Sequence, residues 1–212
     1  MSTDASLAPD RTTRARAVRP AVLAALPGLV LGVAGLFHPT HLNHATAHRW
    51  WTLHVPGMVF FPLVGVALVL LFRGRRDLVA AVAVLAASVY AIFYNALDVL
   101  NGIGAGFVTS RLGVGVPRPD EVRSLFRIGG PMGEIGSWAL LVAAVVVAAD
   151  ALRRHGVRSA GGLLLVPGAW WVHTDHIFAP WGALGMALIG VGTGSLWWAQ
   201  LSTPDVQEES PI

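Results

Sequence analysis

Two histidines and an aspartate follow a long apolar run in the segment His173-Thr174-Asp175-His176. If the run is helical, His173 and His176 lie about one turn apart on the same face, with Asp175 close beside them. Two imidazoles at this spacing can reach one metal ion when further ligands come from another helix. Because ionisable side chains at the edge of an apolar run are costly unless they pair, bind a ligand or face water, this segment indicates a functional site.

Further histidines recur near the ends of other apolar runs. His38 and His54 are the ones we expect to complete a metal site with His173 and His176. The chain has no cysteine, which excludes thiolate ligands and disulfides and leaves His, Asp and Glu as the strong candidate ligands. Zinc fits such a donor set first, and copper or haem iron are the alternatives. The simpler interpretation is that these histidines are hydrated residues at helix ends.

Carboxylates and a tyrosine add candidates for proton transfer. Asp98 and Glu134 are predicted to lie one or two turns inside their apolar runs, and Tyr94 lies one turn before Asp98 on the same face. A carboxyl group kept protonated by apolar surroundings suits general acid or base chemistry. We therefore predict Asp98, Glu134, Tyr94 and Asp175 as catalytic residues. The alternative for Asp98 and Glu134 is a structural role, as a helix cap or as the partner of an arginine, and Glu134 in a first turn would also gain from the helix dipole.

Aromatic side chains gather in the same half of the apolar runs. Those predicted to form the walls of a substrate pocket are Tyr90, Trp138, Trp170 and Trp171. Aromatic walls with a few convergent polar groups are the usual composition of a small-molecule site. The alternative interpretation is an aromatic belt at the membrane surface.

Composition identifies the class of protein that must position these residues. Of the 212 residues, 54% are hydrophobic and only 13% are charged, whereas an ordinary soluble domain has about 25% charged residues. Several runs reach the roughly 20 apolar residues that a helix needs to cross the hydrocarbon layer. The sequence therefore predicts an integral membrane protein. Every basic residue is an arginine and most lie beside apolar runs, so the net charge of +3 reflects topology rather than nucleic-acid binding.

The predicted fold is all-α, a polytopic bundle of six transmembrane helices with short interfacial helices on its outer face. We expect a disordered basic tail over residues 1–20, one membrane domain over 21–200 and a disordered tail over 201–212. Apolar runs place the spans at residues 21–37, 52–72, 78–100, 131–149, 160–178 and 181–199. The expected interfacial helices cover residues 40–51 and 119–127.

Arginine placement predicts the orientation. Ten of the fifteen arginines lie in the N-terminal tail and in the turns at residues 73–76 and 153–158. The positive-inside rule places these segments in the cytoplasm, together with both termini. We therefore expect a multi-pass protein of the cell membrane. Counting spans then brings the candidate site residues to the opposite, outer ends of their helices, whichever way the bundle faces.

The combination of a histidine near the second span, a membrane aspartate and a late histidine pair resembles the membrane hydrolase superfamily of alkaline ceramidases and adiponectin-type receptors. The resemblance implies a zinc ion held by three histidines. This chain departs from that pattern, since six spans are expected rather than seven and the pair is His-x-x-His in the fifth span rather than His-x-x-x-His in the last. The aromatic residues with carboxylates are similar to those of small membrane-bound terpene cyclases and sterol isomerases. No specific motif aligns with either group, so no family is assigned.

We expect a membrane enzyme that acts on a lipid or isoprenoid-like substrate, with a divalent ion that activates water or polarises an oxygen. One alternative is a metal-free isomerase or terpene-type cyclase, in which Glu134 or Asp98 donates a proton and aromatic rings stabilise positive charge. Another is a haem- or copper-binding protein for electron transfer or metal handling. The expected partners are membrane lipids and a hydrophobic small molecule, without nucleic acid, and the sequence leaves a homo-oligomer open.

Overall fold

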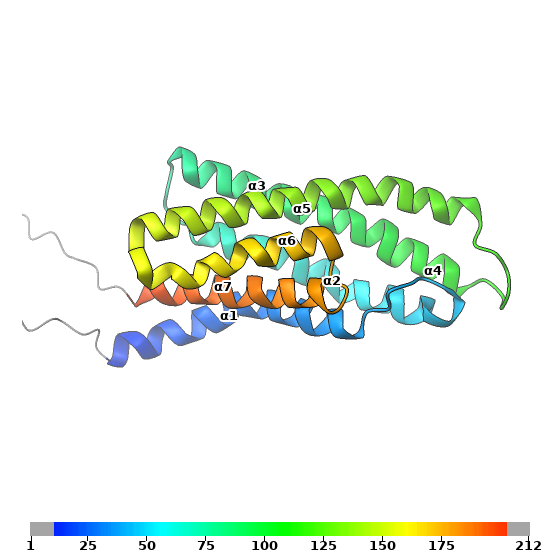
Figure 1. The fold of residues 1–212 in the computed structure, drawn as a ribbon, viewed down its shortest axis with the longest axis horizontal. Coiled ribbons are helices and arrows are strands. Elements are labelled where there is room, and N and C mark those ends of the chain that lie inside the picture. Colours follow the sequence, from blue (N-terminus) through cyan, green and yellow to red (C-terminus); the bar gives the residue numbers. More distant parts are fainter. Residues whose placement is uncertain (1–10, 203–212) are drawn as a thin grey trace, which may run out of the picture.

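The computed structural model describes residues 11–202, which form helices joined by short connections and contain no strand (Figure 1). Most of the two expected tails, residues 1–10 and 203–212, lies outside the described residues. The elements are α1 (Arg11–Phe37), α2 (His44–Leu70), α3 (Leu78–Leu97), the π-helix η1 (Asp98–Gly104), α4 (Ala105–Ser110), α5 (Asp120–His155), the 3-10 helix η2 (Gly156–Leu164), α6 (Leu165–Asp175) and α7 (Trp181–Leu201).

Five helical segments in this part of the chain are long and apolar enough to cross a membrane. They are Ala17–Phe37, His44–Leu70, Leu78–Ser110, Asp120–Asp175 and Trp181–Leu201. This confirms the prediction of an all-helical protein suited to a membrane. The fourth segment has 56 residues because α5, η2 and α6 follow one another directly. The chain reverses at Gly156, whose φ of +58° suits a residue without a side chain, and α6 returns along α5 (Figure 1).

The two predicted interfacial helices are not separate elements. The histidine-rich segment runs directly into α2, which a capping box starts at His44: the Asn43 side chain accepts a hydrogen bond from the Thr46 backbone N–H at 3.1 Å, and Thr46 Oγ1 accepts one from the Asn43 N–H at 3.0 Å. Residues from Asp120 onward likewise form the start of α5. The helices α2 and α5 contain Pro56 and Pro131 in their interior and begin well before the expected span starts at residues 52 and 131. Proline is tolerated inside such helices because neighbouring helices can satisfy the backbone groups that it frees.

These early starts make some helices longer than a bilayer is thick. The helix α2 has 27 residues and would be about 40 Å long at 1.5 Å per residue, against roughly 30 Å of hydrocarbon. The first turns of α2, α4 and the start of α5 therefore extend past the ends of α1, α6 and α7 (Figure 1). We call this extension the helical cap. It has its own small core, which consists of Leu42, Ala47, Trp50, Ala105 and Val122.

Glycines allow α1 and α7 to approach closely. A Cβ atom at Gly28 would lie 2.5 Å from the backbone nitrogen of Gly190, and one at Gly32 would lie 2.9 Å from the carbonyl oxygen of Ala183. Small residues four apart let membrane helices come into backbone contact. The sequence spacing of Gly28 and Gly32 thus indicates a helix contact that the structure contains.

Replacing Gly190 with alanine is expected to lower the free energy of unfolding by about 1–3 kcal/mol, as overpacking does elsewhere. The new Cβ would lie 2.7 Å from the carbonyl oxygen of Ala25 and 2.8 Å from the backbone nitrogen of Leu29, so the two helices must separate. Gly130→Ala is the matched control, because no atom lies within 4 Å of its Cβ position. It should raise stability slightly through helix propensity. Equal unfolding midpoints for the two variants in detergent would contradict the close contact.

Candidate metal centre

Three histidines from separate segments converge at one point in the bundle. His38 follows α1, His54 lies in α2 and His176 follows α6. One imidazole nitrogen of each lies within 4.8 Å of the other two. The shortest separation is 3.4 Å, between Nε2 of His38 and Nε2 of His54. Two nitrogens bound at 2.0–2.1 Å to a tetrahedral zinc ion lie about 3.3 Å apart, so this pair already has the spacing of two ligands on one ion.

Backbone carbonyls determine which nitrogens of His38 and His54 carry protons. Nδ1 of His38 lies 2.7 Å from the carbonyl oxygen of Pro39, and Nδ1 of His54 lies 2.7 Å from that of Trp50. A carbonyl only accepts, so each Nδ1 donates and each Nε2 keeps a lone pair. Two lone pairs that face each other at 3.4 Å repel unless a cation lies between them. An Nδ1–H bound to a carbonyl is also the usual outer contact of a metal-ligating histidine.

His176 reaches the cluster through an uncommon backbone conformation. Its φ of +53° lies in the left-handed region, which costs a residue with a side chain of order 1–3 kcal/mol. Nδ1 of His176 and the hydroxyl of Tyr94 hydrogen bond at 2.6 Å. When the hydroxyl accepts from Nδ1–H, the lone pair of His176 is left on Nε2. The fully buried Tyr94 therefore holds the imidazole in place, and Nε2 is free to bind a metal when Nδ1 carries the proton.

Asp98 places an unpaired carboxylate beside the histidines. Its side chain is 0% exposed, and Oδ1 lies 3.8 Å from Nε2 of His54. Neither carboxylate oxygen has a hydrogen-bond partner among the described residues. A buried carboxylate without partners is strongly unfavourable, whereas a cation on the histidines would neutralise it. Asp98 also begins the π-helix η1, an irregularity that is frequent at functional sites.

Two glycines make room for these side chains. A Cβ atom at Gly57 would lie 2.5 Å from Oδ2 of Asp98, and one at Gly102 would overlap the imidazole of His54. Both glycines are buried within helices, where alanine would be the better helix former. Their presence is explained by the close approach of Asp98 and His54 to the neighbouring backbone.

The charge state of His38 suits a metal ligand. Burial lowers the pKa of His38 to about 4, and the positive charge of Arg49 acts in the same direction. The imidazole is therefore neutral at pH 7, as coordination requires. The rings of Trp50 and Phe178 lie 4.8 and 4.9 Å from that of His38 and separate it from the surroundings on the side of the helical cap.

A small cavity borders the cluster between α1 and α2. Its volume is about 30 Å³, which exceeds the 10–15 Å³ that a water molecule needs. His38, His54 and Asp98 form its polar side. The remaining lining is apolar: Val30, Leu31, Ala34, Leu53, Pro56, Gly57, Phe60, Phe61 and Ile177. Pro56 is exposed on the outside of the bundle, so the cavity lies next to the outer surface of the bundle.

His173 does not join this cluster. The helix α6 ends at Asp175, so His176 leaves the helix and the two histidines do not share the helical face that we expected. Nδ1 of His173 instead lies 2.9 Å from Oγ of Ser137, and Nε2 lies 3.9 Å from Oε1 of Glu134. The predicted site residues therefore divide into two groups rather than one.

This second group is open to the surroundings. Glu134 is 62% exposed and accepts a hydrogen bond from the indole N–H of Trp138 at 2.9 Å. Trp138 and Trp170 are 46% and 47% exposed, and their rings lie 4.3 and 5.7 Å from that of His173. We expected Glu134 to be a buried acid and the two tryptophans to be pocket walls. Their side chains point outward instead, as in an aromatic belt.

Three further predicted residues contact side chains outside the two groups of donors. Asp175 is half-buried and accepts a hydrogen bond from the hydroxyl of Thr174 at 2.5 Å. Trp171 stacks against Trp181 at 5.2 Å. Tyr90 is fully buried behind Tyr94, with 5.4 Å between the ring centroids. Sequence reasoning did not identify Gly57, Gly102 and Phe178 as residues of the site. The glycines around Asp98 were the available signal, because glycine within a helix can mark a close approach of other atoms to the backbone.

Comparisons with protein-family models, with curated proteins and with solved structures give no match to this chain. The donor set itself indicates the class of ligand. Three imidazoles and one carboxylate are typical ligands of zinc and other divalent first-row ions. The preoriented donors of this centre, of which His38, His54 and Asp98 are buried, thus fit a metal ion better than they fit an ordinary apolar core.

Proposed function

We propose that this protein is an integral membrane enzyme in which His38, His54 and His176 hold one divalent metal ion, with Asp98 offsetting half of its charge. The observation that carries the proposal is the pair of Nε2 lone pairs that face each other beside a buried carboxylate without a partner. Zinc is proposed first, because catalytic zinc sites combine three protein ligands with an open position for water or substrate.

The chemistry proposed for this centre is metal-assisted attack or isomerisation at a polar group of the substrate. A bound divalent ion polarises an oxygen atom or lowers the pKa of a water ligand. Asp98 lines the cavity beside the donors and is placed to take up or return a proton there. Tyr94 is a positioning residue, since it holds the imidazole of His176 and is not one of the residues that line the cavity.

The surroundings of the centre favour a lipid-like or isoprenoid-like substrate. The cavity of about 30 Å³ admits only a small polar group such as a hydroxyl or carbonyl. Its apolar rim lies between two segments suited to cross a membrane, so the rest of the substrate would stay among the lipids. Trp50 and Phe178 cover His38 on the side of the helical cap, which favours access from the membrane.

The same geometry argues against haem as the cofactor at this centre. Small-molecule pockets usually measure about 300–1,000 Å³, and the cavity here is a tenth of the lower value or less. Nitrogens 3.4 Å apart also leave no space for a macrocycle between them. Copper remains an alternative ion for the three histidines, and elemental analysis of the bound metal distinguishes it from zinc.

We further propose that the bundle crosses the membrane six times. The 56-residue segment Asp120–Asp175 reverses at Gly156, and its two halves lie side by side, so that it would cross twice (Figure 1). Both termini then lie on one side, with the arginine-rich turns at residues 73–76 and 153–158. The positive-inside rule assigns that side to the cytoplasm and the metal centre to the opposite half of the cell membrane.

The proposal predicts about one equivalent of a divalent metal in detergent-purified protein equilibrated with zinc, and its loss in His54→Ala. Metal content is measured by elemental analysis after removal of free ions. The matched control is His48→Ala, because His48 lies on the same helix but is exposed and outside the cluster. Retention of metal by His54→Ala, or a wild type that binds none of zinc, copper and iron, would overturn the proposal.

A further inference from the structure

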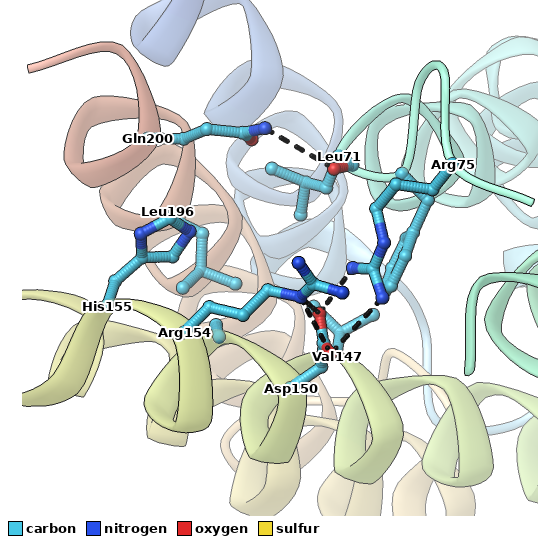
Figure 2. Close-up of a pocket in the computed structure, with 10 residues that line it drawn as sticks. Leu71, Arg75, Val147, Asp150, Arg154, His155, Leu196 and Gln200 are labelled. Atoms are coloured by element: carbon cyan, nitrogen blue, oxygen red, sulfur yellow. Dashed lines mark hydrogen bonds and ion pairs between the residues drawn. The ribbon is translucent and has the colours of Figure 1, made fainter. Parts of the chain in front are cut away.

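A second pocket lies at the other end of the bundle, where the turn after α2 and the ends of α5 and α7 meet (Figure 2). Its volume is about 360 Å³. Buried apolar side chains, among them Phe72, Val147 and Leu196, form its floor. Its polar lining consists of Arg75, Asp150, Arg154, His155 and Gln200. An apolar floor beneath a basic rim is the chemistry of a site for an anionic amphiphile.

An ion-pair network makes this end of the bundle rigid. Asp150 is 5% exposed and receives Arg75 at 2.5 Å, while Arg153 and Arg154 each approach it at 3.1 Å. Arg75 also donates to Asp77 at 2.9 Å, which joins the turn before α3 to α5. Figure 2 shows Arg75 and Arg154 converging on the carboxylate of Asp150. The network holds the guanidinium groups in fixed positions at the pocket.

The aspartates of this network do not neutralise all of the positive charge of the two turns. The two turns contain six arginines, at positions 73, 75, 76, 153, 154 and 158, and among the described residues two aspartates are in contact with them, Asp77 and Asp150. Within this part of the chain, four positive charges at this end of the bundle are therefore in excess. Arg154 binds Asp150 through Nε and comes no closer than 3.6 Å to Asp77, so part of its five-donor guanidinium stays open to a further acceptor. Guanidinium groups held in this way suit the oxygens of a phosphate.

The position of the pocket favours the phosphate of a lipid headgroup over a free phosphate ion. The pocket lies at the ends of two segments suited to cross a membrane and at the reversal of a third, which places it at the level expected for lipid headgroups. Basic pockets between membrane helices bind anionic headgroups, each arginine contributing about 1 kcal/mol. We propose that this pocket binds the headgroup of an anionic phospholipid, with its phosphate against Arg154 and its glycerol and first acyl carbons over the apolar floor.

The test measures thermal unfolding of the full chain in detergent while short-chain phosphatidylglycerol, phosphatidylcholine or inorganic phosphate is added. Phosphatidylglycerol should raise the unfolding temperature at concentrations where phosphatidylcholine does not. Arg154→Gln should weaken the apparent affinity for phosphatidylglycerol about fivefold, the loss expected from one arginine. Arg123→Gln is the matched control, because Arg123 also pairs with an aspartate but lies at the opposite end of the bundle.

A second variant keeps the test informative if Arg154→Gln does not fold. Gln200→Glu adds a negative charge to the rim without touching the arginine–aspartate network, and it should weaken phosphatidylglycerol binding. Equal protection by inorganic phosphate would show an anion site without lipid specificity. Equal protection by phosphatidylcholine, or unchanged affinity in both rim variants, would overturn the proposal.

Discussion

Asp98→Asn is expected to stabilise the metal-free protein while it weakens metal binding. The carboxylate is 0% exposed, and both of its oxygens are without hydrogen-bond partners among the described residues. A buried charge without a partner is strongly unfavourable, so replacing the carboxylate with a neutral amide of the same size is expected to stabilise the metal-free protein by about 1 kcal/mol or more. Because the negative charge favours a cation on the histidines, zinc affinity should fall about 10- to 100-fold, as it does on removal of groups next to metal ligands.

Two unfolding curves test this prediction, one with a chelator and one with excess zinc. Asp98→Asn should unfold at a higher temperature than the wild type in chelator and should gain less from zinc. Asp175→Asn is the control, since Asp175 is half-buried and bonded to Thr174 at the end of α6. Lower stability of Asp98→Asn in chelator would mean that the carboxylate has a structural partner, so that no metal ion is needed to compensate its charge.

A residue that lowers the stability of the empty protein is typical of functional sites, because local rules of stability are broken there for the sake of binding. His176 belongs to the same class, since its positive φ is unfavourable and yet brings its imidazole to the cluster. The π-helix that begins at Asp98 is a third irregularity at the same point. Their coincidence at one point is difficult to explain by packing requirements alone.

The helical membrane fold followed from composition and from the length of the apolar runs, but helix boundaries did not. Pro56 and Pro131 suggested starts near each of them, whereas α2 and α5 begin some three turns earlier. The reason is that a cap such as the Asn43 box decides where a helix begins, and proline inside a membrane helix is tolerated when neighbours pack around it. As a result, the expected interfacial helices became the extensions that form the helical cap.

Span counting correctly brought the ends that carry His38, His54, Asp98 and His176 to the same level. It did not separate His173 from them, because the periodicity argument assumed that the helix continued through His176. The outward orientation of Glu134 could not be predicted from the sequence either. A carboxylate in the first turn of a helix has the same sequence pattern whether it faces the bundle or the outside. These choices depend on rotation of each helix against its neighbours, which local patterns do not contain.

Gly102→Ala should remove the metal site without changing any proposed ligand. Its Cβ would overlap the imidazole of His54 and lie 2.8 Å from Nε2, the nitrogen that faces His38. The ring has little freedom to move, because Nδ1 is bonded to the carbonyl of Trp50, whose indole N–H donates in turn to the carbonyl of Asn101 at 3.0 Å. We expect at least a tenfold loss of zinc affinity and a loss of stability of about 1–3 kcal/mol.

A double-mutant cycle separates steric displacement from general damage to η1. In His54→Ala the space of the imidazole is vacant, so adding Gly102→Ala should cost little further stability while zinc stays unbound. Gly130→Ala, which has no atom within 4 Å of its Cβ, controls for the effect of alanine in a helix. Additive losses in the cycle would show that Gly102 serves the backbone of η1 rather than His54. Wild-type zinc affinity in Gly102→Ala would mean that the ligand positions of the centre do not depend on this close contact.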